Sequence, residues 1–337
     1  MAVVGATITL GSYVAGETHA RAGSLTGAST TVGQGSGAKL ISLNDVTSRH
    51  ALNLRAARNT RHRPRTTTTV SSVTSTSAPA TTTTTPAPTS TTTSLVTTTS
   101  VATALTNGTP SASSPSGMAP PSASALAGYR QSYVTDFPGT SVPSGWYPFT
   151  GTPGGDPGGQ FAASHVVVGG GLMSVNTWKD PAFGNEWVTG GICNCGNPQT
   201  YGAYFVRSRV TGAGPTAVQL LWPLDNSWPP EIDFNETAGD VISTSATVHW
   251  GATNHIDQRK LSIDMTAWHT WGVIWTPTAI TYTVDGRVWG TVTTASEIPN
   301  VAMTLDLQQQ TWCASGWACP TAPQTMQIDW VAQYSPS

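Results

Sequence analysis

The sequence predicts an all-β fold, a sandwich of two antiparallel sheets, in residues 129–337, preceded by a long disordered N-terminal region. Three observations support this. After residue 129, short runs rich in Val, Ile, Thr, Tyr and Trp alternate with clusters of Gly, Pro, Asn and Asp, as strands and turns do. No segment there keeps a helical period over three turns. All 13 tryptophans lie at or after Trp146, so the large side chains that build a core are confined to this part.

The first 128 residues divide into two segments. Residues 1–65 carry 8 basic and 2 acidic side chains and show no sustained periodicity, so we expect a basic, disordered segment. Its run at 49–65 fits either a solvated tail or a contact with anionic envelope polymers or lipid. Residues 66–128 contain no charged residue and are mostly Thr, Ser, Ala and Pro. Such a chain buries too little apolar surface to offset its ordering entropy, so we predict an O-glycosylated linker.

The folded part, residues 129–337, is long enough for one core. Asp285-Gly286 favours a type I′ hairpin turn, because both central positions of that turn need positive φ. Many short strands over about 200 residues fit a sandwich. The predicted strands are 203–210, 217–224, 231–237, 244–250, 270–275, 279–284, 287–292 and 326–334.

Charge and hydropathy exclude some functions. After residue 65 the chain has 7 basic and 15 acidic side chains, which argues against a nucleic-acid partner. No run approaches the roughly 18 apolar residues of a membrane span. The first 20 residues resemble a signal peptide only weakly, since they lack a positive start. With the Thr-rich linker, they lead us to expect a secreted or envelope-associated protein, and a monomer.

Four cysteines form two close pairs, Cys193/Cys195 and Cys313/Cys319, and neither pair has zinc-finger spacing. An even number beside a Thr-rich linker favours two disulfides in an oxidising compartment. Cys313–Cys319 closes easily within one loop, whereas a Cys193–Cys195 bridge would be strained, so a cross-linked pairing stays open. Four free buried thiols are the alternative.

The segment with the clearest chemistry is Glu231-Ile-Asp233-Phe-Asn-Glu236. On a regular strand Glu231 and Asp233 share a face and Glu236 points to the other; one β-bulge returns Glu236 to the first face. The glutamates then lie about 13 Å apart at Cα. Inward-leaning side chains reduce the carboxyl separation to about 5–5.5 Å, that of a retaining glycosidase.

These residues suggest an acid–base site. Three carboxylates this close raise at least one pKa. Glu231 is then the nucleophile, Glu236 the protonated acid/base, and Asp233 the partner that shares a proton with Glu231. The alternatives are an acidic strand facing solvent and a calcium site.

The acidic segment resembles the catalytic signature of glycoside hydrolase family 16, in its bulged, laminarinase-like E-x-D-x-x-E form. The resemblance covers most of 129–337 and nothing before it. It extends to a Y-G-x-Y-x-x-R strand at 201–207, Trp-Pro pairs at 222–223 and 228–229, Thr-Val-His-Trp at 247–250, a tryptophan-rich segment at 268–286 and a closing strand at 326–331. The chain departs from the family at Trp268, often Phe, and at 306–310, where the family has Asn and Gly.

This resemblance implies a jelly roll, two curved antiparallel sheets, with a substrate cleft on the concave face. It implies retaining endo-hydrolysis of a β-linked polysaccharide by Glu231, Asp233 and Glu236, with no cofactor and no metal. We expect an endo-β-1,3-glucanase or β-1,3-1,4-glucanase. Alternatives are a non-catalytic polysaccharide-binding module, a structural wall or matrix protein, and a transglycosylase or hydrolase acting on succinoglycan or a galactan.

Aromatic side chains bind the apolar faces of sugars. We expect five residues near the motif to bind substrate, though a core position is an equal alternative for the tryptophans and a structural role for the histidine. They are Trp222, Trp228, His249, Trp250 and Trp312. Four others alternate along strands and are predicted to be core: Trp271, Trp275, Trp289 and Trp330. His269 is interpreted as structural.

Overall fold

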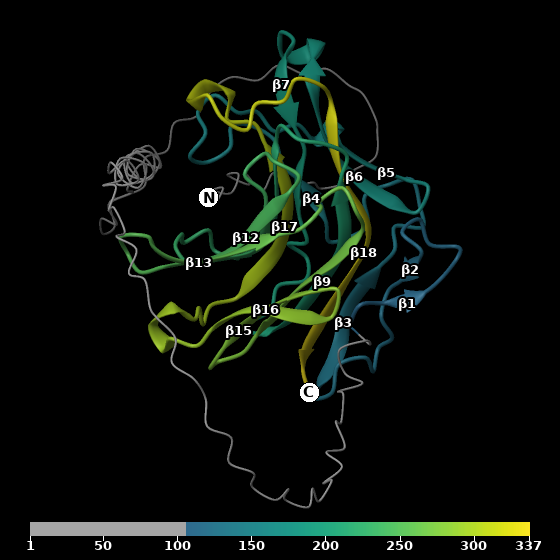
Figure 1. The fold of residues 1–337 in the computed structure, drawn as a ribbon, viewed down its shortest axis with the longest axis vertical. Coiled ribbons are helices and arrows are strands. Elements are labelled where there is room, and N and C mark those ends of the chain that lie inside the picture. Colours follow the sequence, from purple (N-terminus) through teal and green to yellow (C-terminus); the bar gives the residue numbers. More distant parts are fainter. Residues whose placement is uncertain (1–105) are drawn as a thin grey trace, which may run out of the picture. The chain divides into compact units, whose positions relative to one another are not determined.

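The computed structural model of the chain describes residues 106–337, so the predictions for 1–65 and for 66–105 lie outside the described residues. Two antiparallel sheets face each other, which confirms the predicted sandwich (Figure 1). Within the described part, no helix is long and apolar enough to cross a bilayer. The helices there are short 3₁₀ turns: η1 (Ala163–His165), η2 (Pro181–Phe183), η3 (Ala295–Glu297) and η4 (Cys313–Ser315).

The first sheet has seven strands, and the acidic segment forms β11 near its middle. β11 pairs with β10 on one side and β12 on the other. The order is β13 (His255–Ser262), β12 (Ser243–Trp250), β11 (Glu231–Glu236), β10 (Thr216–Pro223), β17 (Met303–Gln310), β8 (Gly191–Cys193) and β4 (Tyr147–Pro148).

The second sheet has nine strands and is built around the long C-terminal strand, which pairs with three others. Its order is β16 (Arg287–Val292), β15 (Ile280–Val284), β14 (His269–Trp275), β9 (Gly202–Val210), β18 (Gln324–Pro336), β6 (Leu172–Asp180) and β5 (Val166–Gly169), with β3 (Tyr129–Thr135) on β18 and β7 (Glu186–Thr189) on β6. All eight predicted strands are present, with ends that differ by at most two residues.

The main core lies between the sheets. Alternate residues of β11, Ile232 and Phe234, are fully buried there, as are Trp271 and Trp275 from the facing sheet. These two tryptophans confirm their core prediction, and Trp289 packs half-buried against the same cluster. Because side chains alternate along a strand, Glu231 and Asp233 of β11 point to the outer face of the seven-stranded sheet.

Residues 106–128, assigned above to the linker, instead cover the outer face of β18 and β9. They include β1 (Thr109–Pro110) and β2 (Met118–Ala119), which lie beside β18 and β3 in Figure 1. The indole of Trp330 donates to the Met118 carbonyl at 2.9 Å, and the Tyr334 hydroxyl donates to that of Ser122 at 3.0 Å. Trp330 is thus buried as predicted, but in a second, outer cluster.

Polar contacts also hold this N-terminal strap, defined as residues 106–128. Asp329 is buried and accepts hydrogen bonds from the Ser114 hydroxyl at 2.5 Å and from the Ser116 backbone N–H at 3.1 Å. The strap uses serines and backbone carbonyls rather than large side chains. Composition therefore gave no sign that it belongs to the folded unit.

The turn and cysteine predictions can be compared directly. Asp285 and Gly286 have φ of 48° and 73°, which confirms the type I′ signal. Both disulfides are local, Cys193–Cys195 and Cys313–Cys319. The cross-linked pairing that the sequence left open is therefore wrong.

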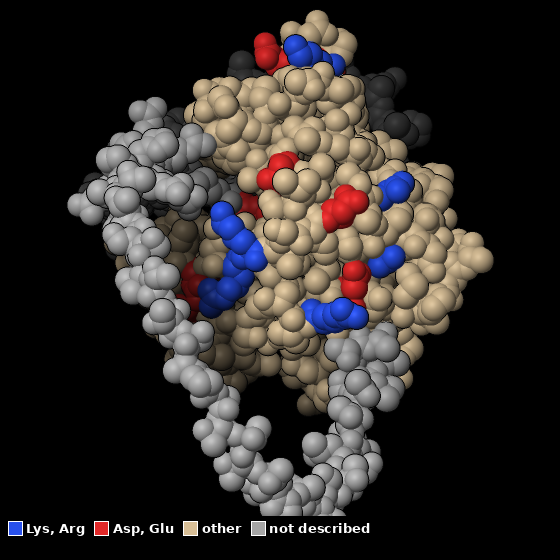
Figure 2. Space-filling view, viewed as in Figure 1, with Lys and Arg blue, Asp and Glu red and all other residues tan. Residues whose placement is uncertain are grey.

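On the face of the molecule shown in Figure 2, uncharged surface predominates, and the charged side chains of the described residues occur singly or in small groups. This matches the low charged fraction of the chain, 9%. The described surface in this view carries no broad basic patch of the kind that binds nucleic acid.

Candidate active site

A β-bulge in β11 brings its three acidic residues to one face. Leu220 of β10 pairs with Asp233, and two positions earlier Val218 pairs with Glu236. Two steps along β10 thus oppose three steps along β11, and the pairing with β12 shifts at the same place. The predicted bulge is confirmed, and it returns Glu236 to the face of Glu231 and Asp233.

We call this outer face of the seven-stranded sheet the site face. Register and alternation place three kinds of side chain on it. The carboxyl groups come from β11, and Val218, Leu220 and Trp222 come from β10. The polar residues come from β12 and β17: Thr247, His249, Thr304, Asp306, Gln308 and Gln310.

Glu231 is fully buried, and its Oε2 accepts a hydrogen bond from Trp228 Nε1 at 2.7 Å. Burial raises the pKa of Glu231 well above its ordinary value, and the negative charge of Asp233 adds to the rise. The Trp228 hydrogen bond acts in the opposite direction, because it stabilises the ionised carboxylate. Glu231 is thus a carboxyl whose protonation depends on its neighbours.

Glu236 lies at the other end of the bulge and is 1% exposed. Its backbone N–H donates to Thr244 Oγ1 at 3.0 Å, which fixes the strand after the bulge. Burial raises its pKa, and the charge of Asp233 adds to the rise. A carboxyl with this pKa retains its proton at a higher pH than an exposed glutamate does, which is what a general acid requires.

Asp233 lies between the two glutamates in sequence and faces His249 of β12. His249 Nδ1 is 2.7 Å from Asn254 Oδ1, a contact that orients the imidazole. Its Nε2 lies 3.4 Å from Asp233 Oδ2. The imidazole and the Asp233 carboxyl are thus neighbours beside Glu231.

Three of these residues also have the arrangement of a metal-ligand group. One ligand atom each from Glu231, Asp233 and His249 lie within 4.8 Å of one another, and all three residues are buried. Two carboxylates and an imidazole suit a divalent transition metal. A cation bound there would occupy the same atoms that acid–base chemistry would use.

The predicted substrate-binding aromatics separate into two groups. Trp222, Trp228 and Trp312 belong to one apolar cluster on the site face, together with Val218 and Leu220. The Trp222 indole donates to Asn226 Oδ1 at 2.9 Å. Trp222 and Trp312 are buried in this cluster, 6% and 2% exposed, which is the core position that the sequence left open for them, and Trp228 is half-buried.

The structure corrects the prediction that Trp250 lies with the substrate-binding residues. It packs half-buried against the main core, on the opposite face of β12 from His249, and its ring contacts His255. The reason is strand alternation: a residue next to His249 cannot share its face. Proximity to the motif in sequence was therefore misleading for Trp250.

Sequence reasoning missed Trp317. Its ring stacks on Trp312 with centroids 5.0 Å apart and planes 13° apart, in the loop that the Cys313–Cys319 disulfide closes. The sequence did contain a signal for Trp317, because it is an aromatic residue two positions before Cys319, in a loop that a Cys313–Cys319 disulfide would close.

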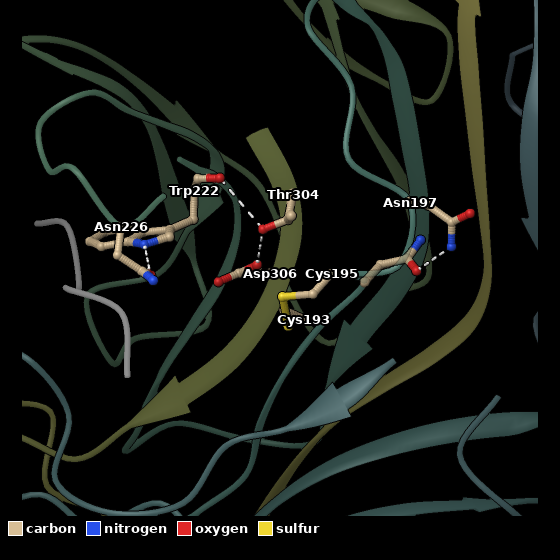
Figure 3. The surroundings of a disulfide bond; sticks show 8 residues. Cys193, Cys195, Asn197, Trp222, Asn226, Thr304 and Asp306 are labelled. Atoms are coloured by element: carbon tan, nitrogen blue, oxygen red, sulfur yellow. Dashed lines mark hydrogen bonds between the residues drawn. A yellow bond between two sulfur atoms is a disulfide. The ribbon is translucent and has the colours of Figure 1, made fainter. Parts of the chain in front are cut away.

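Asp306 was also missed as a candidate site residue. It lies on β17 between Leu220 of β10 and Cys193 of β8, and it is 3% exposed. Figure 3 shows it between the Cys193–Cys195 disulfide and the Trp222–Asn226 pair. The sequence pointed to 306–310 only as a departure from a family pattern.

Comparison with known families gives one match across the folded part. The family model for Glycosyl hydrolases family 16 matches residues 164–332, half of the chain. This range contains both sheets' central strands and every carboxyl group of the site face.

Curated relatives match shorter stretches. Endo-1,3-1,4-beta-glycanase ExsH of Rhizobium meliloti is 33% identical over 105 residues, covering 30% of this chain and 23% of that protein. A beta-glucanase of Rhodothermus marinus is 30% identical over 141 residues, covering 36% of this chain and 48% of that protein. The chain thus spans less than half the length of these relatives.

Solved structures show the same fold. The laminarinase catalytic domain of Thermotoga maritima superposes with a TM-score of 0.54 at 17% identity, covering 62% of this chain and 99% of that one. The laminarinase of Rhodothermus marinus gives 0.53 at 20% identity, with 61% and 97% covered. At these identities the likeness supports the jelly-roll architecture and carries no information on substrate.

Proposed function

The chain belongs to glycosyl hydrolases family 16, and we propose that it is a retaining, endo-acting hydrolase of β-glucans with β-1,3 or mixed β-1,3-1,4 linkages. One observation carries the proposal: the bulge in β11 gathers Glu231, Asp233 and Glu236, all buried, on one face. Relatives named as β-glucan hydrolases support the substrate class.

The proposed reaction has two steps. In the first, the Glu231 carboxylate attacks the anomeric carbon while Glu236 gives its proton to the glycosidic oxygen, so the bond to the leaving sugar breaks and a glycosyl ester forms on Glu231. In the second, Glu236 removes a proton from water. The water oxygen attacks the anomeric carbon, and the ester bond breaks to free Glu231.

The protonation states that this cycle needs are opposite for the two glutamates. Burial raises the pKa of both, and that of Glu231 more strongly, so the pKa order alone does not place the negative charge on Glu231. The Trp228 N–H does favour an ionised Glu231, because a hydrogen bond to a carboxylate is stronger than one to a neutral acid.

The aromatic cluster supports a polysaccharide as substrate. Half-buried Trp228 lies beside Glu231, and sugar rings pack their C–H faces on such indole surfaces, whereas Trp222 and Trp312 are buried in the same cluster. The carboxylate charge that the reaction places on Glu231 favours an uncharged glycan over sulfated or uronate-containing chains, which like charge would repel.

The test is hydrolysis by Glu231→Gln and Glu236→Gln variants on laminarin and mixed-linkage glucan. Each variant should lose at least about 100-fold of the parent rate, as loss of acid–base assistance or of the nucleophile does. With an aryl β-glucoside oligomer whose leaving group needs no proton, Glu236→Gln should recover the first step, seen as a burst of released aryl alcohol, whereas Glu231→Gln should not. Parent-like rates in either variant would exclude the assignment.

The stereochemistry and the mode of cleavage need separate measurements. NMR of the first product should show a β-anomer, which distinguishes retention from inversion. A rapid fall in polymer viscosity with little reducing sugar would support endo-cleavage. A chain that binds laminarin and releases no reducing ends would instead be a polysaccharide-binding module.

We also propose that the protein is a secreted or envelope-associated monomer. Two disulfides among the described residues support an oxidising compartment. Cell fractionation and the sedimentation velocity of the purified chain test the two parts of this proposal.

A further inference from the structure

Asp306 is a buried carboxyl that the proposed reaction does not use. It is in register with Leu220, which is in register with Asp233, so two strand spacings of about 4.8 Å separate it from the acidic strand. It therefore lies on the site face about 10 Å from Asp233, a distance that a neighbouring sugar of a bound chain can span.

Among the residues that the structure describes, the surroundings of Asp306 provide one hydrogen bond and no opposite charge. Thr304 donates its hydroxyl to Oδ1 at 3.0 Å. The strands that flank it contain no other ionisable side chain: β10 reads TAVQLLWP, and Cys193 of β8 is in a disulfide. The remaining titratable groups that β11 and β12 place on this face are Glu231, Asp233, Glu236 and His249. Figure 3 shows the second oxygen of Asp306 on the side of Trp222, away from the disulfide.

Burial raises the pKa of Asp306 to about 8, and the Thr304 hydrogen bond offsets only part of that rise. At neutral pH the group is therefore a carboxylic acid, which can both donate and accept a hydrogen bond. Burying a carboxyl group is costly to folding, so a residue that serves packing alone would be better as Leu.

We propose that Asp306 binds a hydroxyl group of the glycan on the site face, as a neutral carboxylic acid, and thereby helps to select the linkage. This rests on the proposed function for the identity of the ligand. The acid donates to a sugar hydroxyl oxygen through Oδ2 and accepts through the same group's remaining lone pairs, whereas an ionised carboxylate can only accept.

A second polar group on the same strand face supports a binding surface rather than an isolated residue. Gln310, four positions along β17 and thus on the same face, is fully buried, and its side-chain amide makes no hydrogen bond to the described residues. Thr304, Asp306 and Gln310 therefore form a polar row beside the Trp222 cluster. Such a row orients hydroxyls while the tryptophans hold the ring faces.

The test measures binding in a Glu236→Gln background, where no turnover interferes. Three proteins are compared: the Glu236→Gln background chain, and the same chain with Asp306→Leu or Asp306→Asn added. Calorimetry measures the affinity of each for laminarihexaose and for a mixed-linkage hexasaccharide, at pH 6 and at pH 9. At pH 6, Asp306→Leu should bind at least one hexasaccharide about 10-fold more weakly, as loss of one hydrogen bond to a buried polar partner does. Asp306→Asn, which keeps a donor and an acceptor, should stay within about 3-fold.

The pH comparison separates binding from a structural role. Between pH 6 and pH 9 the background chain should lose affinity relative to Asp306→Asn, because residue 306 ionises in the background chain and cannot ionise in the variant. Glu231, Asp233 and His249 are present in both chains, so their titration affects both alike. Equal affinity of Asp306→Leu and the background chain, or an identical pH dependence of the background chain and Asp306→Asn, would overturn the proposal. If Asp306→Leu does not fold, the pH comparison decides alone.

The proposed function fails in a different way. A parent chain that binds these hexasaccharides without cleaving any β-glucan would refute the hydrolase assignment and leave the role of Asp306 in place. A background chain that binds neither hexasaccharide would overturn the role of Asp306.

Discussion

Trp228 Nε1 donates a hydrogen bond to Glu231 Oε2 at 2.7 Å, and this contact joins the aromatic cluster to the acid–base group. The two residues are separated by Pro229 and Pro230, whose peptide bonds are both cis. The indole N–H of Trp228 lies against the carboxyl group of the residue that follows these prolines. Trp228 has a role in setting the charge of Glu231 as well as in offering an apolar surface.

Trp228→Phe should change the pH dependence of the reaction. The variant keeps a ring but loses the N–H, so the pKa of Glu231, already raised by burial, should rise further. The acidic limb of the kcat/KM–pH profile, which reports the ionisation of Glu231, should move to higher pH, and the rate at pH 6 should fall about 10-fold. The profile on laminarin measures both.

Trp222→Phe is the matched control, because its indole N–H donates to Asn226 and not to a carboxyl. It should weaken substrate affinity while leaving the acidic limb in place. If the acidic limb of the Trp228→Phe profile lies at the same pH as in the parent, Trp228 does not influence the ionisation of Glu231.

Divalent transition metals should inhibit the enzyme. Zn²⁺ would bind Glu231, Asp233 and His249, whose ligand atoms lie within 4.8 Å of one another, and would occupy the nucleophile. Inhibition should be competitive with glucan, reversible by chelator and weaker at pH 5 than at pH 7, since protons compete for the ligands. Initial rates against Zn²⁺ concentration measure this.

His249→Asn removes one ligand and should reduce Zn²⁺ affinity at least about 10-fold. Mg²⁺, which prefers all-oxygen ligands, should inhibit little in either chain. Equal Zn²⁺ inhibition of the parent and of His249→Asn would place the metal elsewhere.

The sequence predicted the central strands and the carboxyl cluster because both are local patterns. Alternation and turn residues mark β9 to β12, and the spacing of Glu231, Asp233 and Glu236 required a bulge that is present. β13 reads HIDQRKLS, a half-exposed polar strand whose pairing with β12 is not visible in its own composition.

Residues whose environment comes from distant strands could not be placed in advance. Trp250 and His249 differ by one position, and only the pairing of β12 decides which of them faces Asp233. Asp306 reads as an ordinary acidic residue until β8 and β10 bury it on both sides. The strap at 106–128 is ordered by Trp330 and Asp329, more than 200 residues away in sequence.

Deleting the N-terminal strap should destabilise the fold. A chain that begins at residue 129 would expose Phe205, Trp330 and Tyr334, which the strap helps to bury, and would leave Asp329 without its serine partners. Uncovering even part of three aromatic side chains should cost several kcal/mol, on the order of 2 kcal/mol for each fully uncovered one. Thermal unfolding of this chain and of one that begins at residue 106 tests the prediction. Equal midpoints of the two chains would contradict it.

Asp306 should make stability depend on pH in the alkaline direction. Burial raises its pKa from 3.8 to about 8, so the folded state holds a proton that the unfolded state releases between these values. Its contribution is therefore fully present below about pH 3.8 and is lost as pH rises to about 8. Asp306→Asn removes this term, and relative to the variant the parent should lose up to about 4 kcal/mol of unfolding free energy between pH 5 and pH 8. Denaturant unfolding of both chains at the two pH values measures it. A difference between parent and variant that is the same at pH 5 and pH 8 would show that Asp306 is already ionised in the folded protein.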